Sequence, residues 1–242
     1  MIGTILNASG ILIGGIAGLV RRKPLSAANE SYSRVILGAL TVFYGLRLTW
    51  ISVSGSLMEI LKQLTIVVLA MVVGKLAGRA LALQKMSNRV GQRASEIMNS
   101  ARPDDPDRFN KGFKTCAALF CAAPLGILGS TQEGLTLPEY FYPLAIKGVM
   151  DGLASMSFVT LFGRGVLLAV VPIMAFQGSI TLIVGRVFEP ILTQHHLVDA
   201  VNAAGGMLVF CVALVMLGLK RIELADYLPS LVAAPLIAWL WR

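Results

Sequence analysis

The chain has 242 residues, of which 56% are hydrophobic and 14% are charged, and its formal net charge is +8. Ordinary soluble domains hold roughly 45–50% apolar and about 25% charged residues, so this chain lacks the polar surface that a soluble globule needs. Its basic residues stand in short clusters between apolar runs, which is typical of membrane topology and not of a nucleic-acid-binding face. The composition therefore predicts an all-α, polytopic transmembrane helix bundle.

Eight apolar segments are long enough to cross a bilayer, which takes about 20 helical residues. They are predicted at residues 2–20, 35–54, 61–83, 112–131, 142–162, 165–187, 200–218 and 224–241. A count of seven stays open, because only residues 163–165 separate the fifth and sixth segments and because Pro229 and Pro235 interrupt the eighth. We expect a single transmembrane domain over residues 1–242.

Basic clusters orient the predicted segments, because short cytoplasmic loops are enriched in Lys and Arg. The basic residues at 21–23 place the first loop inside and the N-terminus outside, and alternation then places the basic loop 85–111 in the cytoplasm. In that loop Lys85, Arg89 and Arg93 recur every four residues, so on a helix they form one basic stripe. We expect anionic lipid beside this stripe; the alternative is a solvated loop that only fixes the orientation.

The first and sixth segments resemble one another, as do the second and seventh. Asn7 is matched by Gln177, 170 residues later, and Gly38 is matched by Gly205, 167 residues later. An offset of five helices reverses the direction of a segment in the bilayer. The pattern therefore indicates two units of opposite topology, although short glycine-rich apolar windows also match by chance.

These units are inverted three-helix repeats at residues 1–84 and 165–242, around a central helix pair at 112–162. Inverted repeats are typical of secondary transporters, whose binding sites lie near the middle of the membrane. The alternative is two unrelated glycine-rich segments.

The fifth segment carries two charges inside an apolar run. Lys147 and Asp151 are four residues apart and so share a helical face. A lone charge near the bilayer centre costs about 2.5–3.5 kcal/mol, so the two must pair or face water. Two hypotheses stay open: a proton or ion relay, or a structural ion pair close to the headgroups. Ser155 continues the polar face.

The fourth and first segments add further polar features. Pro124 cannot donate to the carbonyl one turn back, so the segment up to Ser130 is expected either to break and line a cavity or merely to kink. Asn7 and Gln177 bring uncharged amides to equivalent repeat positions. They face a shared site in one interpretation and form an interhelical hydrogen bond without a ligand in the other.

Small residues on two segments predict close helix packing. Gly10, Gly14 and Gly18 recur every four residues, and Gly205 and Gly206 are adjacent in the seventh segment. Such stripes let another backbone approach closely. The same glycine-rich faces also suggest a homodimer.

Nothing in the sequence points to an enzyme. HExxH, GxSxG and glycine-rich phosphate-loop motifs do not occur, and the only histidines, His195 and His196, fall in a predicted outside loop. The three cysteines lie inside apolar runs, where a thiol behaves as a small hydrophobe. We expect no catalytic residue, no metal site and no cofactor.

Several short motifs together resemble one family over nearly the whole chain. They include Gly3-Thr4, Gly129-Ser130, Glu133-Gly134, Asp151-Gly152 and Leu228-Pro229. The chain resembles the bacterial integral membrane proteins grouped as domain-of-unknown-function family 554. This resemblance implies a bacterial inner-membrane protein and supplies no substrate. The family commonly has an acidic residue after the glycine that ends the third segment, whereas here Arg79 follows Gly78.

The leading hypothesis is a small-solute or ion transporter or channel of the inner membrane. Its polar path is predicted from Asn7, Gln177, Lys147 and Asp151 together with residues 124–130. The alternative is a membrane scaffold that transports nothing and recruits partners or lipids through its basic cytoplasmic loop.

Overall fold

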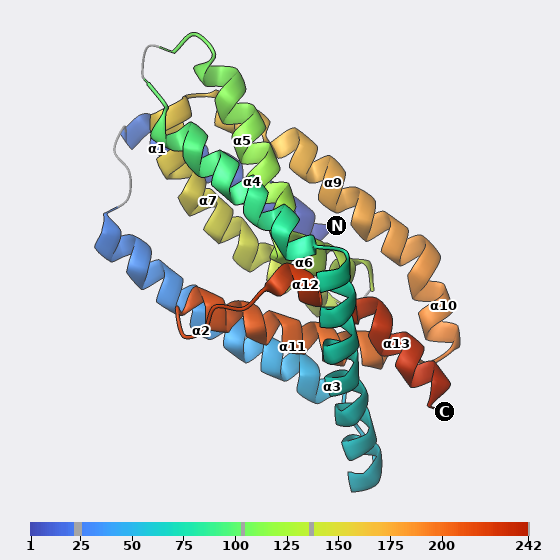
Figure 1. Cartoon of the computed structure of the whole chain (residues 1–242). Helices are drawn as coiled ribbons and strands as arrows, with labels where there is room; N and C mark the ends of the chain where they lie inside the picture. Colours follow the sequence, from blue (N-terminus) through green and yellow to red (C-terminus); the bar gives the residue numbers. More distant parts are fainter. Residues whose placement is uncertain (22–25, 103–104, 136–137, 242) are drawn as a thin grey trace.

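The computed structural model describes residues 1–21, 26–102, 105–135 and 138–241, and over these ranges the chain is a bundle of helices without a β-strand (Figure 1). The predicted fold class, an all-α polytopic helix bundle, is confirmed. Arg22 and Lys23 of the first basic cluster lie outside the described residues.

The helices follow one another with short connections. They are α1 (Ile2–Arg21), α2 (Ala27–Ile51), α3 (Leu57–Ala80), α4 (Leu83–Asn99), α5 (Arg108–Ala122), α6 (Pro124–Gly134), η1 (Pro138–Phe141), α7 (Tyr142–Phe162), α8 (Gly165–Leu168), α9 (Val170–Ile183), the π-helical η2 (Val184–Phe188), α10 (Glu189–Gln194), α11 (Val198–Met216), α12 (Leu224–Tyr227) and α13 (Ser230–Leu240).

The number of candidate spans differs from the predicted eight. Six helices of the described chain are long and apolar enough to cross a membrane, and a seventh results if the bent pair of α5 and α6 forms one span. The eighth predicted segment is the shorter apolar stretch Leu224–Leu240, which is divided into α12 and α13. Seventeen helical residues rise less than the roughly 30 Å of a bilayer core. This segment is therefore too short to cross the bilayer core by itself and depends on packing against the other helices of the bundle.

Gly163 and Arg164, between α7 and α8, form a turn and not a kink. Gly163 has a φ of +69°, which favours glycine. Before the turn, α7 runs parallel to α1, since Gly3 lies against Leu144 and Gly10 against Gly148. After it, the chain runs antiparallel to α1 and continues as one helical stretch to Gln194.

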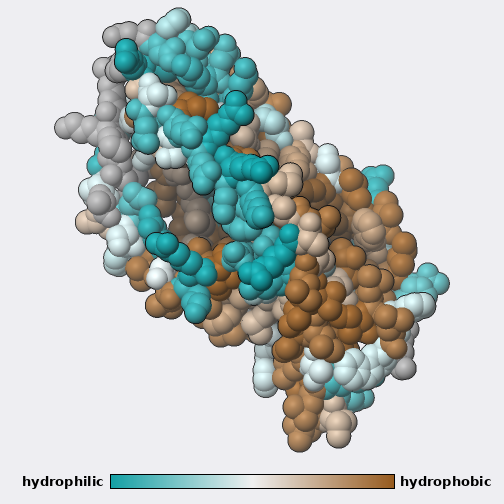
Figure 2. Space-filling model, in the orientation of Figure 1, coloured by the Kyte–Doolittle hydropathy of each residue, from teal (hydrophilic) through white to brown (hydrophobic). Residues whose placement is uncertain are grey.

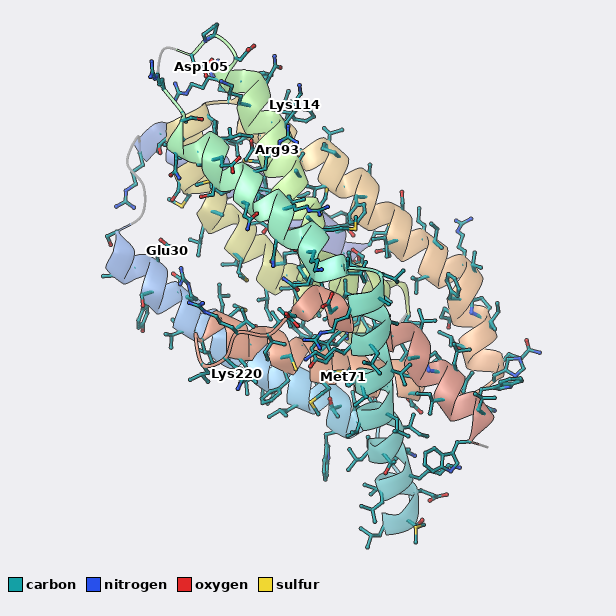
Figure 3. The ribbon with its side chains drawn as sticks, viewed as in Figure 1. Glu30, Met71, Arg93, Asp105, Lys114 and Lys220 are labelled. Atoms are coloured by element: carbon teal, nitrogen blue, oxygen red, sulfur yellow. The ribbon has the colours of Figure 1, made fainter. Side chains whose placement is uncertain are left out.

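The basic loop contains a helix, α4, that is set off from α3 by Ala82 in the left-handed region. Asp226 of α12 accepts a hydrogen bond from the Gln84 backbone N–H at 2.8 Å and so caps the start of α4. Lys85, Arg89 and Arg93 are exposed along α4. Figure 2 shows the polar residues gathered over this end of the molecule, and Figure 3 shows Arg93 and Lys114 there.

Much of the remaining outer surface is apolar. Exposed large apolar side chains include Ile13, Val20, Trp50 and Val68, on α1, α2 and α3. Figure 2 shows a broad apolar surface over α3 and over the helices around α9 and α13. Soluble proteins rarely expose apolar area on this scale, whereas lipid tails cover it without cost.

Candidate transport site at a broken helix

A break between α5 and α6 lies inside the bundle. The axes of the two helices differ by 59°, and Ala123 between them is extended, with φ −66° and ψ 122°. Pro124 begins α6, and its ring has no N–H to donate to the carbonyl of Phe120. The break therefore gives two helix ends, the C-terminus of α5 and the N-terminus of α6, within one predicted span.

Lys147 and Asp151 form an ion pair inside the protein. The side chain of Lys147 is 2% exposed and that of Asp151 11% exposed, and the ammonium donates to Oδ2 of Asp151. The Lys147 nitrogen also lies 5.6 Å from the centre of the Phe120 ring, in the last turn of α5. Both charges are thus kept from bulk solvent, and they face the end of α5 at the break.

Two amides from α1 and α9 meet beside this pair. Asn7 Nδ2 donates to Gln177 Oε1 at 3.1 Å, and the Asn7 side chain lies near the Asp151 carboxylate. Both amide side chains are fully buried, and Asn7 Oδ1 and Gln177 Nε2 have no hydrogen-bond partner. Leaving a buried polar atom without a hydrogen bond costs about 1–3 kcal/mol of folding free energy. A ligand that hydrogen-bonds to these two atoms would therefore be favoured.

The first turn of α6 closes the other side of the cluster. A Cβ placed on Gly126 would lie 3.0 Å from Lys147 Cε and 3.4 Å from Gln177 Nε2. The absence of a side chain at Gly126 thus lets the lysine and the amide approach the α6 backbone. The site joins α1, α7, α9 and the α5–α6 break.

The other predicted path residues lie farther along the same helices. Ser155 is fully buried one turn beyond Asp151 on α7, and its hydroxyl has no partner. Ser130 is also fully buried with its hydroxyl unpartnered, while its carbonyl accepts from Thr181 Oγ1 at 3.2 Å. These two serines extend the polar lining away from the ion pair in both directions.

Sequence reasoning missed the role of Glu133, which lies just after the predicted fourth segment at residues 112–131. Its carboxylate accepts from the backbone amides of Gly3 and Thr4, from Thr4 Oγ1 at 2.7 Å and from Thr181 Oγ1 at 3.2 Å. A carboxylate at the start of α1 is favoured by the helix dipole. Glu133 therefore ties α6 to α1 and α9. Glu133 follows Ser130 by three residues, so on a helix the two share a face. This spacing was the sequence signal that Glu133 could belong to the polar face of the same helix.

Four of the five glycines predicted for packing lie against the backbone of another helix, and Gly205 lies against a side chain. A Cβ on Gly10 or Gly14 would lie 2.2 Å and 2.0 Å from the carbonyl oxygens of Gly148 and Gly152. Gly18 packs against Met156 and Val159 of α7, Gly205 against Gln132, and Gly206 against Gly45 and Thr49 of α2. Gly10, Gly14 and Gly18 of α1 therefore let α7, which carries the ion pair, pack closely against α1.

A cavity opens between α2 and α4 and reaches α7. It has a volume of about 380 Å³, and the surface is hollowed there (Figure 2). Met150, Leu153, Ala154, Ser157 and Phe158 of α7 line it. Phe158 packs on Phe120, with ring centres 6.0 Å apart, and the Phe120 ring lies under Lys147. Phe158, which lines the cavity, thus packs on the ring that Lys147 approaches.

Among the described residues, no group of three or more His, Cys, Asp or Glu side chains is placed to hold a metal ion. Cys116, Cys121 and Cys211 are free thiols. The chemistry that this site offers is that of an ammonium, a carboxylate, two amides and hydroxyls.

The comparisons with known proteins agree with a membrane location. The chain is 27% identical over 237 residues to the uncharacterized membrane protein YdfK of Bacillus subtilis, covering 98% of this chain and 95% of that protein. It is also 27% identical over 244 residues to the uncharacterized protein YqgA of Escherichia coli, covering 100% of this chain and 97% of that one. No solved structure matches the chain. The family model described as "Protein of unknown function (DUF554)" matches residues 2–239, so the chain belongs to the DUF554 family and is a multi-pass membrane protein.

Proposed function

We propose that the protein transports a small solute or an ion, and that the path passes the Lys147–Asp151 pair at the α5–α6 break. The observation that carries this proposal is the burial of both charges against a break in a predicted span. A buried ion pair adds little to stability, because apolar residues of similar volume are often as stable or more so. Ionisable groups inside membrane bundles more often mark solute pathways.

The contacts between helices support the inverted repeat, which belongs to the same proposal. Each helix of the first unit lies antiparallel to its counterpart: α1 to α9, α2 to α11, and α3 to α12 and α13. A two-fold axis in the membrane plane requires such pairs. Asn7 and Gln177, equivalent in the repeat, hydrogen-bond to one another, as residues on that axis would.

The cavity supplies one access route in this proposal. It opens at the end of the molecule that carries α4, with the Glu30–Arg34 ion pair on its rim. We place this end in the cytoplasm and the protein in the inner membrane, because basic residues gather on the cytoplasmic side of short loops. A solute would then reach the ion pair by displacement of Phe158 and Phe120.

Flux into liposomes tests the proposal. The purified full chain is reconstituted, and uptake of a panel of labelled ions, neutral metabolites and organic acids is compared with protein-free liposomes. Lys147→Gln should lower flux at least about tenfold, as loss of a group worth about 1.4 kcal/mol or more in the rate-limiting state does. Lys62→Gln is the matched control, because Lys62 is exposed on α3. Unchanged flux in both Lys147→Gln and Asp151→Asn would contradict this path.

The exposed basic stripe of α4 favours a second candidate function, a scaffold that holds anionic lipid or a partner. In that case no solute of the panel moves, and the triple variant Lys85→Gln, Arg89→Gln, Arg93→Gln copurifies with less anionic lipid by mass spectrometry. Neither candidate is an enzyme.

A further inference from the structure

We infer that the solute is a carboxylate or a similar oxyanion, and that it binds Lys147 in competition with Asp151. This inference rests on the proposed function and names its substrate class. The site has the composition of an anion-binding site whose occupant, in this structure, is the protein's own carboxylate.

The first support is the set of groups around the Asp151 carboxylate. The ammonium of Lys147 on α7 donates to it, and the Asn7 amide of α1 lies near it. Charge-assisted hydrogen bonds of this kind are what a carboxylate solute would use. Because Asp151 belongs to the same helix as Lys147, its release needs only a rotation of its own side chain.

The second support is a donor that the internal carboxylate leaves unused. Gln177 Nε2 is fully buried, has no partner and lies at the first turn of α6, beside Gly126. The α6 helix has 11 residues and begins inside a predicted span. The N-terminus of such a half-helix carries positive dipole and free N–H groups, and in transporters it points at anionic solute groups.

The polarity of the cluster favours an anion over a cation. A cation would have to replace Lys147 at Asp151, next to the N-terminal end of α6 and the unpartnered Gln177 donor. An anion at Lys147 instead adds a partner for that donor. The unpartnered Asn7 Oδ1 is compatible with a hydroxyl on the solute.

Binding an anion changes the charge balance of the site. Once Lys147 pairs with the solute, Asp151 is a buried carboxylate without a counter-charge, and it takes up a proton from the aqueous side because an unpaired buried charge is costly. The other titratable groups near Asp151 are Lys147 on its own helix and Cys116 and Cys121 on α5, while α1 contributes Asn7. One proton therefore enters with each anion that binds Lys147.

The experiment uses the reconstituted full chain in liposomes that contain a pH-sensitive dye. Inwardly directed gradients of succinate, L-lactate and inorganic phosphate, with the higher concentration outside, are imposed in turn, with choline, sodium and glycerol as non-anionic probes. We expect internal acidification driven by at least one anion and by none of the other three. Transport of choline, sodium or glycerol but of no anion would overturn the inference and leave the proposed function standing. Transport of no probe would overturn both.

Variants separate competition from a purely structural ion pair. Asp151→Asn removes the internal competitor, so the anion should bind about tenfold more tightly, equal to about 1.4 kcal/mol, and enter without its proton. Lys147→Gln should abolish anion binding. Gln177→Met keeps the ion pair intact and should weaken binding several-fold through loss of one hydrogen bond.

Lys62→Gln and Asp199→Asn make the same chemical changes at exposed positions and should behave as wild type. Binding is followed by the anion-dependent rise in melting temperature of the purified protein. If Asp151→Asn and Lys147→Gln weaken anion binding equally, the competition model is wrong. If either variant does not fold, Gln177→Met tests the anion site instead. Unchanged anion affinity in Gln177→Met would contradict the proposal that the anion binds beside Gln177.

Discussion

The two sides of α7 pack by opposite means. Towards α1, Gly148 and Gly152 touch Gly10 and Gly14 backbone to backbone, with no side chain between them. Towards the α5–α6 break, the same helix presents a buried ion pair among amides with unpartnered atoms. At these four glycines the first interface has no side chain that can adjust. The second consists of polar groups that can exchange partners while the helices stay in place.

This contrast indicates that one side of α7 fixes the position of the helix and that the other side presents the polar groups of the candidate site. Close backbone contact fixes the position of α7 by van der Waals packing, which any added atom disrupts. With α7 held rigidly on one side, Lys147 and Asp151 keep their relation to the break without being locked to one another. The following predictions break or sharpen this comparison.

The largest effect is expected from filling the rigid side. Gly14→Val places a Cβ about 2 Å from the Gly152 carbonyl oxygen, so α1 and α7 must separate. Overpacking costs about 1–3 kcal/mol where side chains can shift, and occasionally more. Here two backbones must separate, so we expect a larger loss than in any variant below, with little monodisperse protein in size-exclusion chromatography.

The matched control is Gly91→Ala in α4, where nothing lies within 4 Å of the added Cβ. Its stability should be unchanged or raised by up to about 1 kcal/mol, because alanine favours helix. Wild-type yield and melting temperature for Gly14→Val would show that the interface is not tight.

An intermediate effect is expected from the polar side. Lys147→Met or Asp151→Leu alone leaves a buried charge without its partner and should cost about 3–5 kcal/mol in denaturant unfolding in detergent. The double variant should cost less than either single one, because it removes both charges together. Additive costs in this cycle would mean that the two residues act independently.

The smallest effect is expected at Glu133, which links the rigid α1 to the broken helix. Glu133→Gln keeps an acceptor for Thr4 and Thr181 but removes the charge at the start of α1, which should cost about 1 kcal/mol. The same unfolding assay on Glu189→Gln, in the partly exposed first turn of α10, should show a change within about 0.5 kcal/mol, because Gln keeps the acceptor for Thr193 Oγ1. Equal losses in the two variants would argue against a role for the α1 dipole.

Much of the candidate site was open to prediction because its strongest signals are local. The four-residue spacing of Lys147 and Asp151 predicts their pairing on a helix, and Pro124 predicts an interruption near Phe120. The pairing of Glu133 with Thr4 and the capping of α4 by Asp226 were not predictable, since their partners are distant in sequence. Hydropathy alone also predicted an eighth full span, whereas the chain there forms two short helices.

By itself, the sequence determined that this protein is a helical membrane bundle, because runs of apolar residues have no other stable state in lipid than a helix with its backbone bonded internally. It also determined which residues are too polar for lipid. Only the tertiary structure decided that these residues meet, because α1, α7, α9 and the break reach one place through contacts between distant segments. The glycine contacts that set this arrangement depend on backbone distances of a few ångströms, which no local pattern encodes.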